Sequence, residues 1–171
     1  DSVIDVADRL AFQLGRAFAT KEDQCGFIGD GTSTYGGMSG LFTLLADSNH
    51  TASKVTAATN HDLFSEIDAT DLSNLMAALP EYAHEGAKWY CSQVAWSTVF
   101  WRLMAASGGN AISDLAGKFA RAYGGYEVVT CPALPAGAAT DYSGLTMLAF
   151  GNLRLSSKFG ARRDIRIRVL D

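Results

Sequence analysis

The sequence is most informative in its first 41 residues, DSVIDVADRLAFQLGRAFATKEDQCGFIGDGTSTYGGMSGL. Ser2 can cap a helix, Asp5 follows it at capping-box spacing, and Gly26 is of the type that commonly follows a helix C-terminus. At about 100° per residue, one face of this helix collects apolar side chains, namely Val3, Ala7, Leu10, Leu14, Ala17, Phe18 and Cys25. A helix of about 23 residues is about 35 Å long, so it spans a whole domain.

One large side chain breaks the amphipathic pattern of this helix. Phe12 falls on the opposite, charged face, among Asp8, Arg9 and Arg16. An aromatic ring exposed on a long helix indicates a neighbour that covers it. We therefore expect Phe12 to contact another subunit.

The glycine-rich segment 29–41 is predicted to be a loop. It lacks the G-x-x-x-x-G-K-[ST] motif and follows a helix instead of opening one, which argues against a phosphate site. Gly37-Met38-Ser39-Gly40-Leu41 approaches the G-x-S-x-G pattern, but Leu41 stands at the last glycine position. A serine nucleophile is therefore not favoured.

The remainder of the chain predicts short helices followed by strands. Periodicity indicates a helix ending before Pro80, with Asp68 or Thr70 as its cap, and a helix from Ser92 to about residue 106. Strands are expected at 88–91, 126–131, 145–150 and 164–169, and residues 46–62 read as a polar surface excursion. The fold class is α+β. Trp96 and Phe100 belong to a helix that is apolar on nearly every side, so it is buried in a core or against another subunit.

Composition limits the class of protein. The chain has 171 residues, 18.2 kDa and 48% hydrophobic residues, which suits one domain or two small lobes. No apolar run is long enough for a transmembrane helix. Cys25, Cys91 and Cys131 are widely spaced, so we expect buried thiols instead of disulfides or a zinc site. Because the first residue is not Met, we expect a piece of something longer.

Charge is divided between the two halves of the chain. Residues 1–85 hold 4 basic and 13 acidic side chains, and residues 86–171 hold 10 basic and 5 acidic ones. The basic side chains of the last segment are Arg154, Lys158, Arg162, Arg163, Arg166 and Arg168. They fit three interpretations: contact with nucleic acid, a salt-bridged subunit seam, or a solvated face.

No enzyme motif is apparent. His50, His61 and His84 form no metal-binding pattern, and no carboxylate stands in an apolar run that would raise its pKa. We predict no catalytic residue, no metal and no cofactor. Because catalytic groups can assemble from distant segments, this prediction is open to structural test.

The order of motifs resembles the major capsid proteins of tailed bacteriophages, whose shell fold is shared with encapsulins. In that family a long "spine" helix ends in an acidic run, here Lys21-Glu22-Asp23, followed by Gly29-Asp30-Gly31-Thr32 and a Gly-Leu step at Gly40-Leu41. Further matches are 108–112 (GGNAI), 125–129 (GYEVV, with Glu127 where the family has Pro) and 150–153 (FGNL). The resemblance covers nearly the whole chain, in order.

The resemblance implies a two-lobed shell subunit. Residues 1–45 and 154–171 would form a peripheral lobe with the spine helix and the last long strand, and residues 46–153 an axial lobe. The N-terminal arm, the extended loop, and the final helix and strand of the family lie outside this sequence, so it looks like a core piece. Candidate subunit-interface residues are Phe12, Trp96, Phe100, Arg162, Arg163, Arg166 and Arg168.

The implied function is that of a tailed-phage or prophage major capsid protein. It would assemble in the bacterial host cytoplasm into pentamers and hexamers of the virion capsid, with no membrane. Partners would be further copies of the chain, scaffold and portal proteins, and double-stranded DNA held by non-specific electrostatics.

Three other functions stay open at this point. The first is an encapsulin-type shell that holds a cargo enzyme instead of DNA. The second is a small α+β hydrolase in which Ser39, His84 and an Asp converge in a pocket. The third is a nucleotide-binding module that uses the loop at 29–40.

Overall fold

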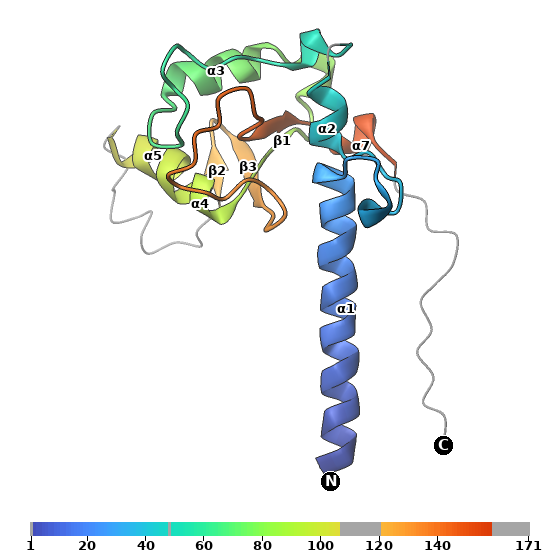
Figure 1. The fold of residues 1–171 in the computed structure, drawn as a ribbon. Helices are drawn as coiled ribbons and strands as arrows, with labels where there is room; N and C mark the ends of the chain where they lie inside the picture. The colour runs from blue at the N-terminus through green and yellow to red at the C-terminus, as the bar shows by residue number, and fades with distance from the viewer. Residues whose placement is uncertain (1, 48, 107–120, 159–171) are drawn as a thin grey trace.

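The protein consists of one long helix that projects from an α+β body (Figure 1). The computed structural model describes residues 2–47, 49–106 and 121–158. The helices are α1 (Ser2–Ile28), α2 (Leu41–Leu45), α3 (Ala69–Ala77), α4 (Gln93–Ala95), α5 (Arg102–Ala106) and α7 (Leu153–Ser156). Short turns are η1 (Ser33–Tyr35), η2 (Thr51–Ser53) and η3 (Glu81–Ala83), and η4 (Trp96–Trp101) is a π-helix. The α+β class is confirmed.

The long first helix is confirmed and runs slightly past its predicted end. It continues through Gly26 to Ile28, because the ring of Phe27 packs against those of Phe42 and Tyr90, with centroids 6.2 Å apart in both pairs. Gly29 ends the helix. A Cβ there would lie 2.5 Å from the carbonyl oxygen of Met38, so only glycine permits this close approach.

The second predicted helix is confirmed as α3. Asp68 is its N-cap and accepts hydrogen bonds from the backbone N–H groups of Thr70 and Asp71. Asp71 returns the interaction by accepting from the backbone N–H of Asp68, which completes a capping box. Leu72 is then buried on the inner face of α3, and Pro80 follows the helix.

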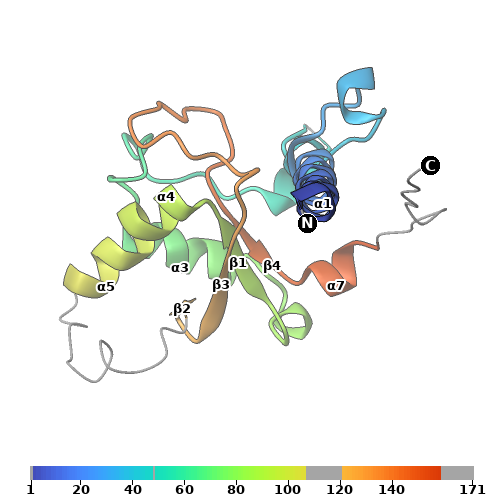
Figure 2. The same ribbon diagram turned by 90° about the horizontal axis from the view of Figure 1, so that it is seen from below.

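A four-stranded mixed sheet lies in the body in the order β2-β3-β1-β4 (Figure 2). The strands are β1 (Lys88–Cys91), β2 (Ala122–Tyr123), β3 (Tyr126–Thr130) and β4 (Ala149–Gly151). β1 runs parallel to β3, with Trp89 opposite Val128, and antiparallel to β4, with Trp89 opposite Phe150. Gly124 and Gly125, both with positive φ, make the tight turn between β2 and β3.

The predicted strands agree with this sheet to different degrees. Those at 88–91 and 126–131 are confirmed. The predicted strand at 145–150 is too long, since only residues 149–151 pair with β1. Its early part turns at Gly144, which has a φ of 73°, and packs beside Tyr142 instead of joining the sheet. The predicted strand at 164–169 lies outside the described residues.

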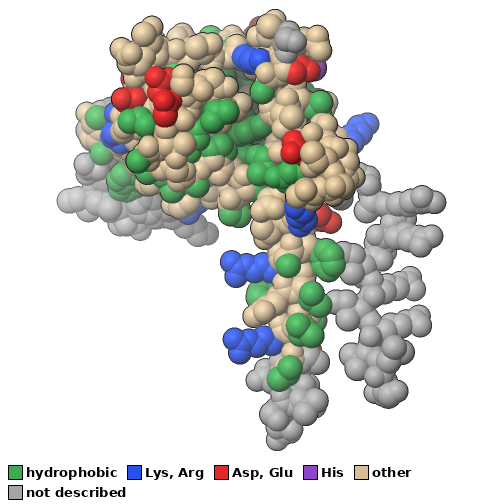
Figure 3. Space-filling view, viewed as in Figure 1, with side chains coloured by type: hydrophobic (Ala, Val, Ile, Leu, Met, Phe, Trp, Pro, Cys, Tyr) green, Lys and Arg blue, Asp and Glu red, His purple; other side chains and the backbone are tan. Residues whose placement is uncertain are grey.

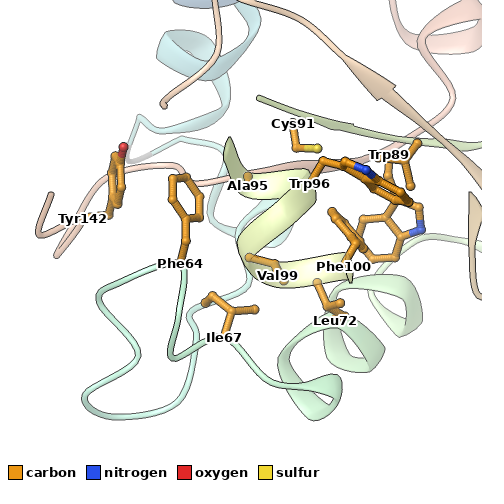
Figure 4. Close-up of a cluster of buried hydrophobic side chains, with 11 residues drawn as sticks. Phe64, Ile67, Leu72, Trp89, Cys91, Ala95, Trp96, Val99, Phe100 and Tyr142 are labelled. Carbon is orange, nitrogen blue, oxygen red and sulfur yellow. The ribbon is translucent and has the colours of Figure 1, made fainter. Parts of the chain in front are cut away.

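The core forms around the central helix, by which we mean α4, η4 and α5 together (residues 93–106). Ser92 caps it as predicted, accepting from the backbone N–H of Ala95. Its inward side chains meet the sheet on one side and the segment before α3 on the other, in a buried cluster: Phe64, Ile67, Leu72, Trp89, Cys91, Ala95, Trp96, Val99, Phe100, Val128 and Tyr142 (Figure 4). The rings of Trp89 and Phe100 lie 5.3 Å apart.

A second, smaller cluster joins the projecting helix to the body. Phe42, Tyr90 and Leu134 are buried in it, and Phe27 of α1 and Leu153 of α7 pack against them. Among the described residues, this cluster contacts α1 only near its C-terminal end, at Asp23, which lies 3.7 Å from the Cys131 sulfur, and at Phe27. The remainder of the helix extends away from the body (Figure 1).

Candidate assembly surface

The projecting part of α1 exposes hydrophobic side chains along one face. We call Val6, Leu10, Leu14 and Phe18 the apolar stripe, since they recur every four residues. Leu10 is 58% and Phe18 is 46% exposed. In a monomeric protein, the apolar face of a helix is normally covered by the core. An uncovered apolar face is typical of a surface that packs against another segment or another chain.

Phe12 makes a second surface on the same helix. It is 71% exposed and lies about 160° around the helix axis from Leu10 and Leu14. Arg9 and Arg16, three residues before it and four after it, lie on the same side and form no ion pair with any described side chain. Basic side chains extend from one side of α1, and hydrophobic ones from the other (Figure 3). The two faces therefore differ in composition and lie on different sides of the helix.

Two of the candidate interface residues are core residues instead. Trp96 is 7% exposed, Phe100 is fully buried, and their rings stack 5.9 Å apart. The sequence left open whether the central helix is buried inside the chain or against another subunit, and the structure shows burial inside the chain. These two side chains are therefore unavailable to a neighbour. Arg162, Arg163, Arg166 and Arg168 lie outside the described residues.

The glycine-rich loop is closed upon itself. The backbone N–H of Gly40 donates to the carbonyl of Gly29 at 2.7 Å, and that of Gly31 to Met38 at 3.0 Å. Asp30 accepts hydrogen bonds from the hydroxyl and the backbone N–H of Thr32, which lower the pKa of its carboxyl group. These bonds use the loop's polar groups to shape the loop.

The side chains of the proposed hydrolase site are not brought together. One ring nitrogen of His84 bonds the hydroxyl of Tyr126 at 2.8 Å, and the other bonds the carbonyl of Leu79 at 3.1 Å. Ser39 instead lies in the glycine-rich loop, where its backbone forms an isolated antiparallel β-bridge with Asp30. His84 therefore has no ring nitrogen left to activate Ser39.

The three cysteines are free and buried, as predicted. Burial raises the pKa of the Cys91 thiol to about 12, and it also raises the pKa of Cys131. Both thiols are protonated at neutral pH, so neither is an activated nucleophile.

His61 and Asp71 form a polar clamp that sequence reasoning missed. His61 Nδ1 lies 2.6 Å from Asp71 Oδ2, and the other oxygen of Asp71 accepts from the backbone N–H of Ala58. The hydrogen bond to Asp71 raises the pKa of His61, and the charges of Asp71, Asp68 and Glu66 raise it further. Burial raises the pKa of Asp71, but the bonds from His61, Ala58 and Asp68 outweigh it, so the net shift is downward.

A metal ion is the other occupant to consider at this clamp. One ligand atom from each of His61, Asp68 and Asp71 lies within 4.8 Å of the others. Asp68 and Asp71 already accept the N–H groups that start α3, and His61 is bonded to Asp71. The group therefore serves to fix residues 58–61 against α3. The D-x-x-D spacing of a capping box was a signal for the two carboxylates, but no signal pointed to His61.

A groove lies beside this clamp. Its volume is about 320 Å³, between the segment after α2 and residues 142–150. Phe42, Leu72 and Tyr142 form its buried apolar lining, and His61 and Asp71 form part of its wall. Leu145, 64% exposed, and Asp62 also line it. An apolar groove with charged groups at its edge can hold a hydrophobic side chain of a protein partner.

No described helix has the length and apolar character required to cross a membrane. Comparison with known proteins gives one informative result. A family model described as the phage capsid family matches residues 1–171 of the sequence. No curated protein and no solved structure matches the chain.

Proposed function

This chain belongs to the phage capsid family, and from that premise we propose that it assembles with copies of itself into the pentamers and hexamers of a phage shell. The family is one of structural proteins of the virion capsid. The observation that carries the proposal is α1, which is anchored to the body at one end only and exposes hydrophobic side chains on two faces. Monomeric proteins rarely expose hydrophobic side chains over such an extended surface, so the two faces favour a subunit that associates with other copies.

We propose that the chain has two lobes and that the two faces of α1 make two kinds of contact. Residues 1–45 and 154–171 form a peripheral lobe in this proposal, and residues 46–153 form an axial lobe. Leu153 of α7 packs in the same cluster as Phe27, so the chain after α7 starts at the attached end of α1. The 13 residues from 159 to 171 span about 43 Å when extended, close to the length of about 40 Å for α1.

The pattern of this last segment supports the peripheral lobe. Ile165, Ile167 and Val169 alternate with Arg166 and Arg168, and such alternation gives a strand one apolar face. The apolar face suits the apolar stripe of α1 in the same chain. Phe12 is then left for a neighbouring subunit.

The shell is proposed to enclose double-stranded DNA through non-specific electrostatic contacts. Scaffold and portal proteins are the expected further partners, and the bacterial host cell is the place of assembly. The basic second half of the chain supports a contact with a polyanion. An encapsulin-type cargo shell is the alternative for the contents.

Electron microscopy of the negatively stained full-length protein tests this function. The protein is purified free of nucleic acid, with and without a co-expressed scaffold. We expect rings or closed shells in at least one preparation, and DNA in particles recovered from an infected or induced host. A protein that stays monomeric at high concentration in both preparations would contradict the proposal.

A further inference from the structure

The starting point is the isolated position of Phe12. Its ring is 71% exposed on the charged side of α1, with Arg16 one helical turn further on. If the last segment of the chain covers the apolar stripe, Phe12 is not covered by it, because it lies on the other side of the helix. A ring flanked by an unpaired arginine has the composition of an interface anchor, since aromatic residues and Arg are enriched at energetic hot spots.

The groove on the body offers the matching features. Its lining is largely apolar, and its volume of about 320 Å³ exceeds that of a phenyl ring. Asp62 lies on its lining with an exposed side chain that forms no ion pair among the described residues. Acidic side chains gather on the corner of the body away from α1, and hydrophobic side chains continue from that corner across the same face (Figure 3).

Phe12 cannot reach the groove of its own chain. It lies about 24 Å along the helix from Ile28, where α1 joins the body. The helix extends away from the body that carries the groove (Figure 1). The ring and the groove must therefore find their partners on different molecules.

We propose that Phe12 of one copy inserts into the groove beside the His61–Asp71 clamp of a second copy, with Arg16 facing Asp62 across the contact. This inference rests on the proposed function, since it requires copies that associate, and it names the two surfaces that meet. The surfaces belong to different parts of the chain, so the contact is head-to-tail. Contacts of this kind build closed rings when the rotation between copies closes.

The chemistry of the two sides is complementary. The phenyl ring leaves water for an apolar lining, and Leu145 at the edge of the groove is covered at the same time. The Arg16 guanidinium can pair with the Asp62 carboxylate in a bidentate geometry that also fixes the orientation of the helix. Lys54, on the same lining, already donates to the carbonyl of Ala46. Asp8, four residues before Phe12, carries a negative charge that complements the positive charge of Lys54 across the proposed contact.

A charge exchange tests the pairing in the full-length protein. Arg16→Glu places a carboxylate opposite Asp62 and is expected to weaken association at least tenfold, measured by sedimentation. Adding Asp62→Arg to Arg16→Glu is expected to restore association. The side chain of Asp62 can be changed without loss of the local turn. Glu66 holds this turn by accepting the backbone N–H groups of Asp62 and Leu63. Thermal unfolding of each variant checks that both still fold.

A disulfide trap tests the contact without requiring shells to close. Protein with Gly15→Cys, which lies one turn from Phe12 on the same face of α1 and keeps the ring, is mixed with protein with Leu145→Cys under mild oxidation. A covalent heterodimer is expected. Protein with Leu10→Cys, about 160° around the helix axis from Phe12, is the matched control and should give little heterodimer with Leu145→Cys. The native cysteines are buried and do not compete.

The outcomes separate this inference from the proposed function. If the wild-type protein forms rings or shells, but the trap gives no heterodimer and Arg16→Glu associates normally, the contact is overturned and the function stands. If the wild-type protein does not associate and the trap also fails, both are overturned. A specific heterodimer with rescue by the charge exchange supports the contact.

Discussion

The central helix and α1 are both rich in hydrophobic side chains, yet one is buried and the other is exposed. Phe100 of the central helix is enclosed by Trp89, Trp96 and Tyr123, while Phe12 of α1 meets solvent. The central helix is short and lies between the sheet and α3. Only the C-terminal end of α1 packs against the body, and the remainder of α1 extends away from it (Figures 1 and 2). The difference teaches that a hydrophobic helix identifies a buried surface, but the remainder of the fold decides whether the chain itself buries it.

The largest expected effect comes from removing a buried aromatic ring of the central helix. Phe100→Ala should lower the free energy of unfolding by about 3–5 kcal/mol, because it removes a fully buried ring and leaves a cavity. Chemical denaturation followed by far-UV circular dichroism measures it. Unchanged stability would show that the central helix is not the core of the chain.

The junction between the two regions should be the next most sensitive place. Gly29→Ala puts a methyl group 2.5 Å from the Met38 carbonyl and 2.6 Å from that of Cys25. Since both obstacles are backbone atoms, we expect a loss of about 1–3 kcal/mol in the free energy of unfolding. Gly15→Ala on the open part of α1, where no atom lies within 4 Å, is the matched control and should not destabilise the protein. Equal effects at both positions would remove the closed junction from the account.

The His61–Asp71 clamp should make the stability of the body depend on pH. The folded pKa of His61 is above its ordinary value of 6.5, so its contribution is complete below that pH and is lost as pH rises through the folded pKa. The folded pKa of Asp71 is below 3.8, so its contribution is complete above that pH and is lost as pH falls through the folded pKa.

The clamp is therefore strongest between about pH 4 and pH 6.5. In denaturation measured across pH, His61→Gln should remove the loss of stability on the alkaline side of this range. Asp62→Asn, which changes a neighbouring exposed carboxylate, should leave that loss in place. A His61→Gln protein with the wild-type pH profile would contradict the clamp.

The smallest effect on folding is expected at Phe12. Phe12→Ala should change the free energy of unfolding of the unassembled protein by no more than about 0.5 kcal/mol, because the ring makes little contact within the chain. The same substitution should reduce association strongly, as measured by sedimentation. A stability loss close to that of Phe100→Ala would mean that Phe12 is covered within its own chain.

The elements predicted correctly are those that local chemistry specifies. The helix α3 was predicted from the periodicity before Pro80, with Asp68 or Thr70 as its cap, and the structure shows that Asp68 is the cap. The Ser92 cap marked the start of the central helix. The predicted strand at 145–150 was too long because its pairing depends on Phe150 meeting Trp89 across the sheet, which no local pattern encodes. The short helices α2 and α7 were missed because five and four residues are too few to show helical periodicity.

The candidate site divides in the same way. Phe12 was proposed because it breaks the amphipathic pattern of its own helix, and the structure shows that its ring is exposed. Its contact with another subunit stays a prediction. Trp96 and Phe100 were proposed as interface residues because an apolar helix has the same pattern inside a chain and between chains. The groove joins residues from 42 to 150, and His61 meets Asp71 from ten positions away, so both depend on tertiary structure.

Solvent access beside Phe12, before and after assembly, is the most direct test of the claim that α1 is an assembly surface. The Gly15→Cys protein keeps the ring of Phe12 and places a thiol one turn away on the same face of α1. It is labelled with a thiol reagent, which is selective because the native cysteines are buried. The thiol should react rapidly in the unassembled subunit and be strongly protected in assembled particles, with full reaction regained on dissociation. A thiol that reacts equally fast in both states would contradict the claim.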